Sequence, residues 1–366
     1  MRLAIGAAAM MSPARGGHEL PIYPSFYPHE IEIRTLDPER AGNALRSAEI
    51  QAYVGSAVEL GQQRENIRAI ESLGFIVLVR INPARNLDEP SACATVNAVA
   101  RELAAEASFV PHPYPVTPFH GDYLHHTDLA AAAKARLSEG AAPARRPRIR
   151  AGGELARHHP EWSAGEDDWD AEIIEIDAAE AMANDTFFVN GRLGPPWLKT
   201  GWFNAERLLA DNVEDGAARE QVQAAWSRLT TGDFTGLAQR INLERELVTL
   251  LTRRCQKAVV GYTVKREYVN VEFSAGIENI GYDAIAGLAS PMFIRTVKLK
   301  DFPWNGWLAL GIGGKPSAAW NPVAGMTDSF GRLMGFAVAD PALMPAPYDA
   351  GWMLNRISDL PPDGAR

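Results

Sequence analysis

The alternation of hydrophobic and polar residues predicts a succession of strands and helices in the first third of the chain. Residues 30–36 alternate strictly and predict a strand, because successive side chains of a strand point to opposite faces. Asp37 and Pro38 then begin a helix that we expect to reach about Ser47, since proline suits the first helical turn. The uninterrupted apolar run at 74–81 predicts a central strand that is buried on both faces.

Further elements continue this order. The patterns predict a strand at 50–54, a helix at 63–72 and an alanine-rich amphipathic helix at 91–107. Strands that alternate with helices are typical of α/β proteins. We therefore expect an α/β N-terminal lobe over residues 18–137.

The second half of the chain shows a different order of patterns. Residues 170–177 predict a strand, and a short helix and a second strand at 187–189 follow it. Three later runs have helical spacing and two alternate like strands: residues 203–212, 217–229 and 234–256, then 259–273 and 292–299. This order predicts an α+β second lobe over residues 169–366. Residues 138–168, rich in Gly, Pro, Ala and Arg, are expected to link the two lobes.

A resemblance to a known family is carried by residues 30–56. They form a strand, a short helix and a strand that ends Ala-Tyr-Val-Gly-Ser. This unit resembles a strand-helix-strand unit of periplasmic solute-binding proteins, with Ala48 and Gln51 where those proteins usually have glycine and aspartate. The resemblance implies a two-lobed protein that binds a small ligand in a cleft, with Tyr53 and Ser56 nearby. Any α/β domain with a similar unit is the alternative.

One stretch, residues 111–129, concentrates groups that bind metals or transfer protons. It holds four of the eight histidines and four prolines, which stiffen the backbone. His120 and Asp122 share one face of an extended backbone, and the helix N-terminus that follows keeps a nearby imidazole neutral. Neutral imidazole is the form that binds metals. The candidate metal ligands are therefore His112, His120, Asp122, His125 and His126, with Zn²⁺ or copper as the ion.

The same stretch has a second interpretation. A His-Gly-Asp turn before a capped helix can be structural, or can form the wall of a pocket that holds no metal. Tyr123 is then a candidate ligand contact. Because His125 and His126 are adjacent, both reach a single ion only where the backbone turns sharply. We expect at least two of the four histidines to converge with Asp122 on one cavity.

A second candidate site is the irregular segment 194–202. Its glycines and prolines hold Trp197, Lys199 and Trp202, and aromatic side chains on rigid loops suit stacking against a ligand. These three residues are therefore candidate ligand contacts. The alternative is that the two tryptophans cover a hydrophobic core.

Composition and charge exclude some classes of partner. The chain has 366 residues, of which 46% are hydrophobic and 22% charged, so it can bury a sizeable core. Its net charge of −9 argues against nucleic acid, whose phosphates need a basic face. No apolar run approaches the roughly 18–20 residues of a transmembrane segment. Cys93 and Cys255 allow one disulfide, and they leave open whether it forms.

The first 17 residues bear on the compartment. A basic start, an apolar run and small residues resemble a secretory signal, so residues 1–17 predict export to the periplasm. A buried first strand in a cytoplasmic protein is the alternative.

Two hypotheses of function follow. The first is an exported protein that binds a small molecule or a metal, with a membrane transporter or an enzyme as its partner. The second is a metal-dependent hydrolase or oxidoreductase that uses the same histidines with Zn²⁺ or copper. The sequence leaves open which of the two applies, and it identifies no catalytic base.

Overall fold

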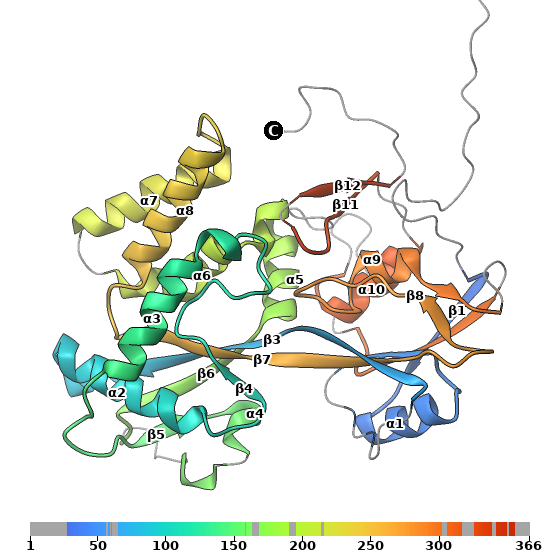
Figure 1. Cartoon of the computed structure of the whole chain (residues 1–366), viewed down its shortest axis with the longest axis horizontal. Coiled ribbons are helices and arrows are strands. Elements are labelled where there is room, and N and C mark those ends of the chain that lie inside the picture. The colour runs from blue at the N-terminus through green and yellow to red at the C-terminus, as the bar shows by residue number, and fades with distance from the viewer. Residues whose placement is uncertain are drawn as a thin grey trace, which may run out of the picture.

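A large mixed sheet organises the computed structural model, and helices lie on both of its faces (Figure 1). The structure describes residues 28–55, 58, 60, 65–157, 159–162, 168–189, 195–213, 216–301, 306–316, 326–338, 342–349 and 351–355. The expected signal segment 1–17 and the candidate ligand contact Ser56 lie outside these residues. None of the described helices is long and apolar enough to cross a membrane.

The main sheet has eight strands in the order β1-β10-β2-β7-β3-β6-β5, and β4 pairs with β7 outside this path. These strands are β1 (Glu30–Thr35), β2 (Ala52–Val54), β3 (Ile67–Ile81), β4 (Phe109–Pro111), β5 (Ile149–Ala151), β6 (Ala171–Asp177), β7 (Lys257–Asn270) and β10 (Trp307–Ile312). Two small sheets consist of β8 (Ile277–Asn279) with β9 (Lys298–Leu299) and of β11 (Leu343–Pro345) with β12 (Trp352–Leu354).

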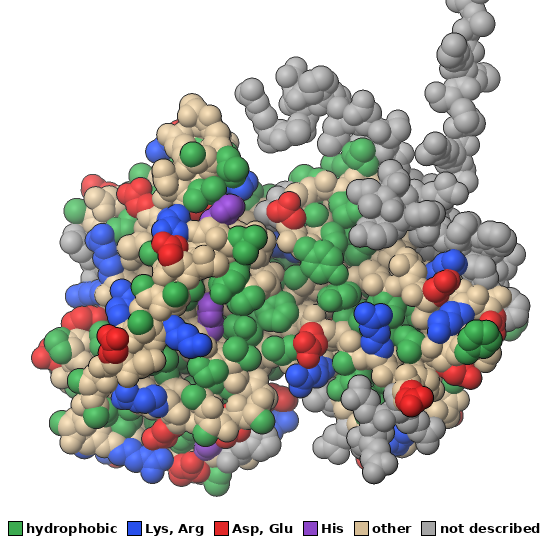
Figure 2. Space-filling view, in the orientation of Figure 1, with side chains coloured by type: hydrophobic (Ala, Val, Ile, Leu, Met, Phe, Trp, Pro, Cys, Tyr) green, Lys and Arg blue, Asp and Glu red, His purple; other side chains and the backbone are tan. Residues whose placement is uncertain are grey.

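The helices gather at the two ends of the long strands β3 and β7 (Figure 1). One end carries α2 (Glu89–Leu103), α3 (Thr127–Glu139), α4 (Gly153–Ala156), α6 (Gly201–Leu209), α7 (Gly216–Thr231) and α8 (Leu237–Leu251). The other end carries α1 (Pro38–Arg46), α9 (Pro291–Thr296) and α10 (Ser329–Val338), and α5 (Ala178–Val189) lies between the two ends. Figure 2 shows hydrophobic side chains gathered on this face where the two ends meet.

The antiparallel pair β3–β7 connects the two ends. Twelve residue pairs join the two strands, from Ile67 opposite Asn270 to Arg80 opposite Lys257, and the register shifts twice, after Leu73 and after Val77. Separate hydrophobic clusters lie at the ends, one around Trp202 and Leu247 and another around Phe293. The prediction of a mixed α/β protein is confirmed, and the structure builds it around one large sheet. Strands from both predicted lobes join the one sheet, and the boundaries at 137 and 169 stay a prediction.

Local signals explain the helix that the sequence predicted after β1. The side chain of Asp37 accepts a hydrogen bond from the backbone N–H of Arg40, and Pro38 occupies the first turn. The helix ends at Arg46, as expected. The same device starts α2, where Asp88 accepts from the N–H of Ser91.

Three predicted elements were wrong. Residues 67–72 belong to β3, because their hydrogen bonds with β7 outweigh a pattern that also suits a helix. Residues 187–189 end helix α5 and form no strand. Residues 291–296 form helix α9, because Ser290 caps it by accepting from the N–H of Phe293 and Pro291 opens it.

Cys93 and Cys255 form a disulfide, which the sequence left open. It joins α2 to the segment that enters β7. The carboxylate of Glu89 lies beside it and accepts a hydrogen bond from the backbone N–H of Cys255.

Candidate functional site

Asp122 fixes the start of helix α6. Its two carboxylate oxygens accept hydrogen bonds from the backbone N–H groups of Gly201 (2.7 Å) and Trp202 (3.1 Å). These donors have no partner within their own helix, and the positive end of the helix favours a negative charge there. Glycine is needed at 201, since an added Cβ would lie 2.7 Å from Cβ of Val116. The helix start is thus pressed against the proline-rich segment.

His126 returns to Asp122 through a single turn of 3₁₀ helix at Tyr123–His125. Its Nε2 lies 4.0 Å from a carboxylate oxygen of Asp122, and its Nδ1 is 2.8 Å from the hydroxyl of Tyr114. The imidazole has no exposed surface, and Nε2 has no hydrogen-bond partner among the residues that the structure describes. Burial lowers the pKa of His126 to about 4, helped by the nearby Arg245 and His125, so the ring is neutral at physiological pH.

Glu244 approaches the same point from helix α8. One ligand atom each from Asp122, His126 and Glu244 lies within 4.8 Å of the other two, and we call these residues the acid–imidazole cluster. Burial raises the pKa of Glu244 to about 7, and the charge of Asp122 adds to this. Arg240 opposes it, with Nε 3.3 Å from Oε1 of Glu244. The other oxygen, Oε2, is buried without a hydrogen-bond partner.

The sequence analysis missed Glu244. Its helix has the apolar positions Leu243, Leu247 and Val248, and Glu244 lies beside them on the buried face. An acid on the apolar face of an amphipathic helix was the available signal, because charged residues are rarely buried without a partner.

The other predicted metal ligands have partners of their own. Nδ1 of His120 accepts from the backbone N–H of Thr117 (2.9 Å), and its Nε2 is 3.1 Å from the amide of Asn204. Burial lowers the pKa of His120 to about 3. His112 donates from Nε2 to the carbonyl of Val116.

The backbone carbonyl of His125 accepts a hydrogen bond from the side chain of Arg245. The imidazole ring of His125 is partly exposed. Of the five predicted ligands the structure therefore brings Asp122 and His126 together. The metal role of the whole set stays a prediction.

The predicted ligand contacts lie in several different places. Tyr53 is fully buried and donates its hydroxyl proton to the carbonyl of Leu36. Trp202 belongs to the core cluster, and Trp197 and the half-buried Tyr123 pack against that cluster. Lys199 is buried between the two ends of the molecule, with Nζ 2.5 Å from the carboxylate of Asp283. The ligand-binding role of these residues stays a prediction.

A cavity of about 650 Å³ opens beside the histidine-rich stretch, and we call it the basic cavity. Its walls come from α2, residues 113–115, α3, the end of α8 and the start of β7. Most lining side chains are apolar, and the disulfide forms part of the wall. The charged residues that line it within the described part of the chain are all cationic: Arg136, Arg253, Arg254 and Lys257.

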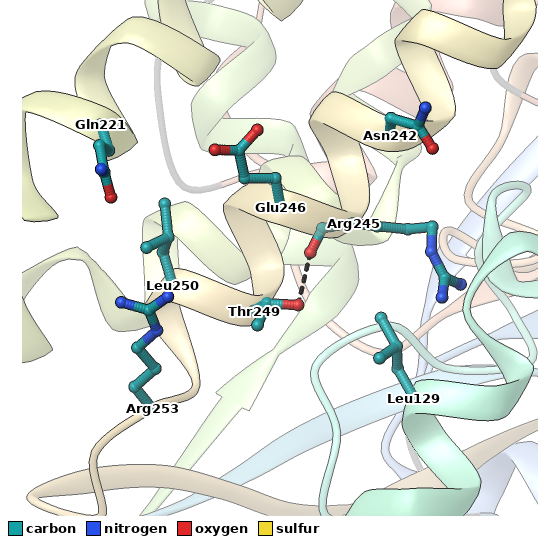
Figure 3. A pocket seen from close by; sticks show the side chains of 8 residues that line it. All are labelled: Leu129, Gln221, Asn242, Arg245, Glu246, Thr249, Leu250 and Arg253. Carbon is teal, nitrogen blue, oxygen red and sulfur yellow. Dashed lines mark hydrogen bonds between the residues drawn. The ribbon is translucent and has the colours of Figure 1, made fainter.

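A second hollow of about 490 Å³ adjoins the basic cavity (Figure 3). Leu129, Thr249 and Arg253 line both. Figure 3 shows Arg245 on helix α8 and Arg253 just beyond the end of that helix, with Leu129 of α3 facing the helix. Arg245 is held by the carboxylate of Asp128 at 2.7 Å.

Comparisons with known proteins give similarity of structure without similarity of sequence. Neither a protein-family model nor a curated protein matches the chain. Among solved structures, HbpA2 from Haemophilus parasuis aligns with a TM-score of 0.41 and 9% identity, over 71% of this chain and 56% of its own. The oligopeptide-binding protein AppA from Bacillus subtilis has a TM-score of 0.38 and 13% identity, with coverages of 72% and 58%.

The murein tripeptide binding protein MppA from Escherichia coli aligns with a TM-score of 0.37 and 12% identity, over 72% of this chain and 56% of its own. The likeness is one of fold. AppA and MppA are solute-binding proteins, the class that residues 30–56 resemble. The chain spans somewhat more than half of the length of these three proteins.

Proposed function

We propose that this chain is a solute-binding protein that holds a small anion with an apolar body in the basic cavity. The observation that carries the proposal is the combination of volume and charge in this cavity. About 650 Å³ lies within the range of roughly 300–1,000 Å³ that is usual for small-molecule sites. Apolar walls with a few convergent charged groups are also usual for such sites.

The cations of the basic cavity point to an anionic ligand. Within the described residues, neither Arg136 nor Arg253 forms an ion pair. Arg254 lies 3.9 Å from the carboxylate of Glu89, and Lys257 lies 3.4 Å from that of Asp211. A guanidinium group binds a carboxylate through two parallel hydrogen bonds, so an organic acid suits the two arginines.

The cavity walls are stiff, which favours binding. Pro113 and Pro115 fix the backbone on both sides of Tyr114, and the Cys93–Cys255 disulfide ties together another part of the wall. A site that is already shaped loses less conformational entropy when a ligand binds.

We also propose that the protein acts in the periplasm and delivers its ligand to a membrane transporter or a partner enzyme. The disulfide supports an oxidising compartment, because disulfides are rare in reducing cytosol. We infer the transporter or partner enzyme only from the class of protein that the fold resembles.

The alternative, a metal-dependent enzyme, is less favoured by the geometry. A catalytic ion keeps one coordination position open to water or substrate. Asp122, His126 and Glu244 have exposed fractions of 5%, 0% and 2%, so a substrate has no direct access to them in the described structure.

Binding of anions tests the proposal. We expect aromatic and aliphatic carboxylates from a small panel to raise the melting temperature and bind in calorimetry, and their neutral amides to bind much more weakly. The double variant Arg136→Gln/Arg253→Gln should weaken carboxylate binding by at least about tenfold, the effect of losing roughly 1.4 kcal/mol. The control Arg68→Gln removes an exposed arginine at the far end of β3 and should leave binding unchanged.

Three results would contradict this function. One is equal binding of a carboxylate and its neutral amide. Another is an unchanged dissociation constant in the double variant. A panel without any binder would remove the assignment of the basic cavity as a site for organic acids.

A further inference from the structure

We propose that the acid–imidazole cluster binds one divalent transition-metal ion, which ties the 122–126 turn to helices α6 and α8. The ligands are a carboxylate oxygen of Asp122, Nε2 of His126 and a carboxylate oxygen of Glu244. This site is separate from the basic cavity, and the proposal does not depend on the solute-binding function. Its role is structural, because all three side chains are buried.

The geometry of the three side chains suits an ion such as Zn²⁺. Imidazole and carboxylate are both common ligands of zinc, with bonds of about 2.0–2.2 Å. Two ligand atoms on a tetrahedral ion are therefore roughly 3.3 Å apart. The three atoms here lie within 4.8 Å of one another, so a modest inward movement of the side chains completes the coordination.

Two buried polar atoms of the acid–imidazole cluster lack a hydrogen-bond partner among the described residues. Nε2 of His126 and Oε2 of Glu244 have no hydrogen-bond partner, and the 4.0 Å between Nε2 and Asp122 is too long for a hydrogen bond. Each such atom is costly to bury, and two of them in one cluster of three residues call for a partner. A cation that accepts a lone pair from both atoms satisfies the two at once.

Tyr114 prepares the imidazole for this role. Its hydroxyl oxygen is 2.8 Å from Nδ1 of His126 and can accept the Nδ1–H proton. The lone pair is then on Nε2, the nitrogen that lies 4.0 Å from a carboxylate oxygen of Asp122. Second partners of this kind commonly orient histidine ligands in metal sites. Tyr114 is therefore a positioning residue for the ion.

The balance of charge also favours a cation. Asp122 and Glu244 bring two carboxylates together, and Arg240 on α8 supplies one positive charge 3.3 Å from Glu244. The remaining charge is compensated in part by the N-terminus of α6. A proton on Glu244 is the competing solution, and a divalent ion would replace that proton.

Zinc binding by the untagged full chain tests the proposal. Protein freed of metal with a chelator is dialysed against Zn²⁺ and then against zinc-free buffer, and zinc is measured by elemental analysis. We expect one zinc per chain and a higher melting temperature in the presence of zinc. When Co²⁺ replaces Zn²⁺, we expect the bound cobalt to absorb visible light with a spectrum typical of an ion that has a nitrogen ligand. Glu244→Gln should weaken zinc binding by more than about 100-fold. Loss of a residue that only hydrogen-bonds to a ligand weakens metal binding by about 10–100-fold, so the loss of a direct ligand should exceed this range.

Two further variants separate ligation from a general effect on stability. Tyr114→Phe should weaken zinc binding by about 10–100-fold, as expected for a residue that orients a ligand. Glu246→Gln is the matched control, because Glu246 is exposed on the same helix. It should bind zinc like the unmodified chain. Glu244→Gln keeps the shape of the side chain and removes a buried charge, so we expect it to fold.

Clear outcomes overturn the proposal. It fails if the unmodified chain retains no zinc and its melting temperature does not respond. It also fails if Glu244→Gln and Glu246→Gln bind zinc equally, since the zinc then sits on the surface. If Glu244→Gln does not fold, the Tyr114→Phe affinity and the Co²⁺ spectrum of the unmodified chain decide.

Discussion

Two groups in this molecule join one imidazole to two carboxylates, and they differ in almost every other respect. In the surface histidine cluster, His159 lies 2.8 Å from Glu106 and 2.9 Å from Glu161. In the acid–imidazole cluster, His126 is 4.0 Å from Asp122 and makes no hydrogen bond through Nε2. The first imidazole is 18% exposed and the second has no exposure.

The difference shows what burial does to the same chemical groups. At the surface, burial lowers the pKa of His159, but the hydrogen bonds that its ring makes to the carboxylates of Glu161 and Glu106 outweigh burial and raise this pKa. The ring bridges the two carboxylates by itself. In the interior, burial lowers the pKa of His126 and raises that of Glu244, and the groups do not pair. At the surface, the imidazole forms hydrogen bonds to both carboxylates. In the interior, the imidazole and the carboxylates do not hydrogen-bond to one another, which is why the acid–imidazole cluster alone suggests a missing ion.

The largest expected effect comes from removing Asp122. Asp122→Ala leaves the N–H groups of Gly201 and Trp202 buried without acceptors and should lower the free energy of unfolding by about 2–4 kcal/mol. Urea denaturation measures the loss. The control is Asp128→Ala, which removes an exposed partner of Arg245 and should cost much less. Equal losses in the two variants would show that burial does not distinguish the two aspartates.

A second prediction concerns the contact that holds the buried cluster together. Gly201→Ala places a Cβ 2.7 Å from Cβ of Val116 and should destabilise the protein by about 1–3 kcal/mol through overpacking. Val116→Ala in the same chain should recover part of this loss, and a double-mutant cycle measures the recovery.

The control for Gly201→Ala is another glycine in a helix. An added Cβ at Gly335 in α10 meets no atom within 4 Å, so Gly335→Ala should leave stability unchanged or raise it by up to about 1 kcal/mol. If Gly201→Ala behaved like Gly335→Ala, the start of α6 would not be pressed against Val116. The buried cluster would then lack its rigid frame.

The two clusters also show how far sequence patterns reach. Helix α1 and the second half of strand β3, residues 74–81, were predicted because their signals are local: a capping aspartate before proline, and a long apolar run. Asp122 and His126 belong to the predicted set of five ligands, in which at least two histidines were expected beside Asp122. The structure groups His126 alone of the four histidines with Asp122, because both residues lie in one turn. Glu244 was missed because a helix far along the chain brings it there, and only tertiary packing determines that approach.

The basic cavity and the disulfide could not be predicted from local sequence patterns, because both depend on tertiary packing. The cavity is lined by α2, α3, α8 and β7, and no short pattern records that these elements meet. Cys93 and Cys255 are 162 residues apart, so their pairing depends on the position of α2 beside the start of β7. The errors at 67–72 and 292–296 have a different cause. At each place the local pattern suited both a helix and a strand, and strand pairing at 67–72 and helix capping at 292–296 determined which of the two forms.

The smallest expected effect belongs to the surface histidine cluster and depends on pH. The pKa of His159 in the folded protein is raised above the ordinary 6.5, so its stabilising effect is fully present below pH 6.5 and is lost as the pH rises through the folded pKa. His159→Gln should therefore lower the free energy of unfolding by less than about 1 kcal/mol at about pH 5.5, and leave it unchanged at about pH 8.5. His29→Gln, an exposed histidine before β1, is the control. A loss of the same size at both pH values would show that His159 contributes mainly by stacking on Trp162, whose ring centre is 3.6 Å away, and the contrast between the two imidazoles would then rest on packing instead of charge.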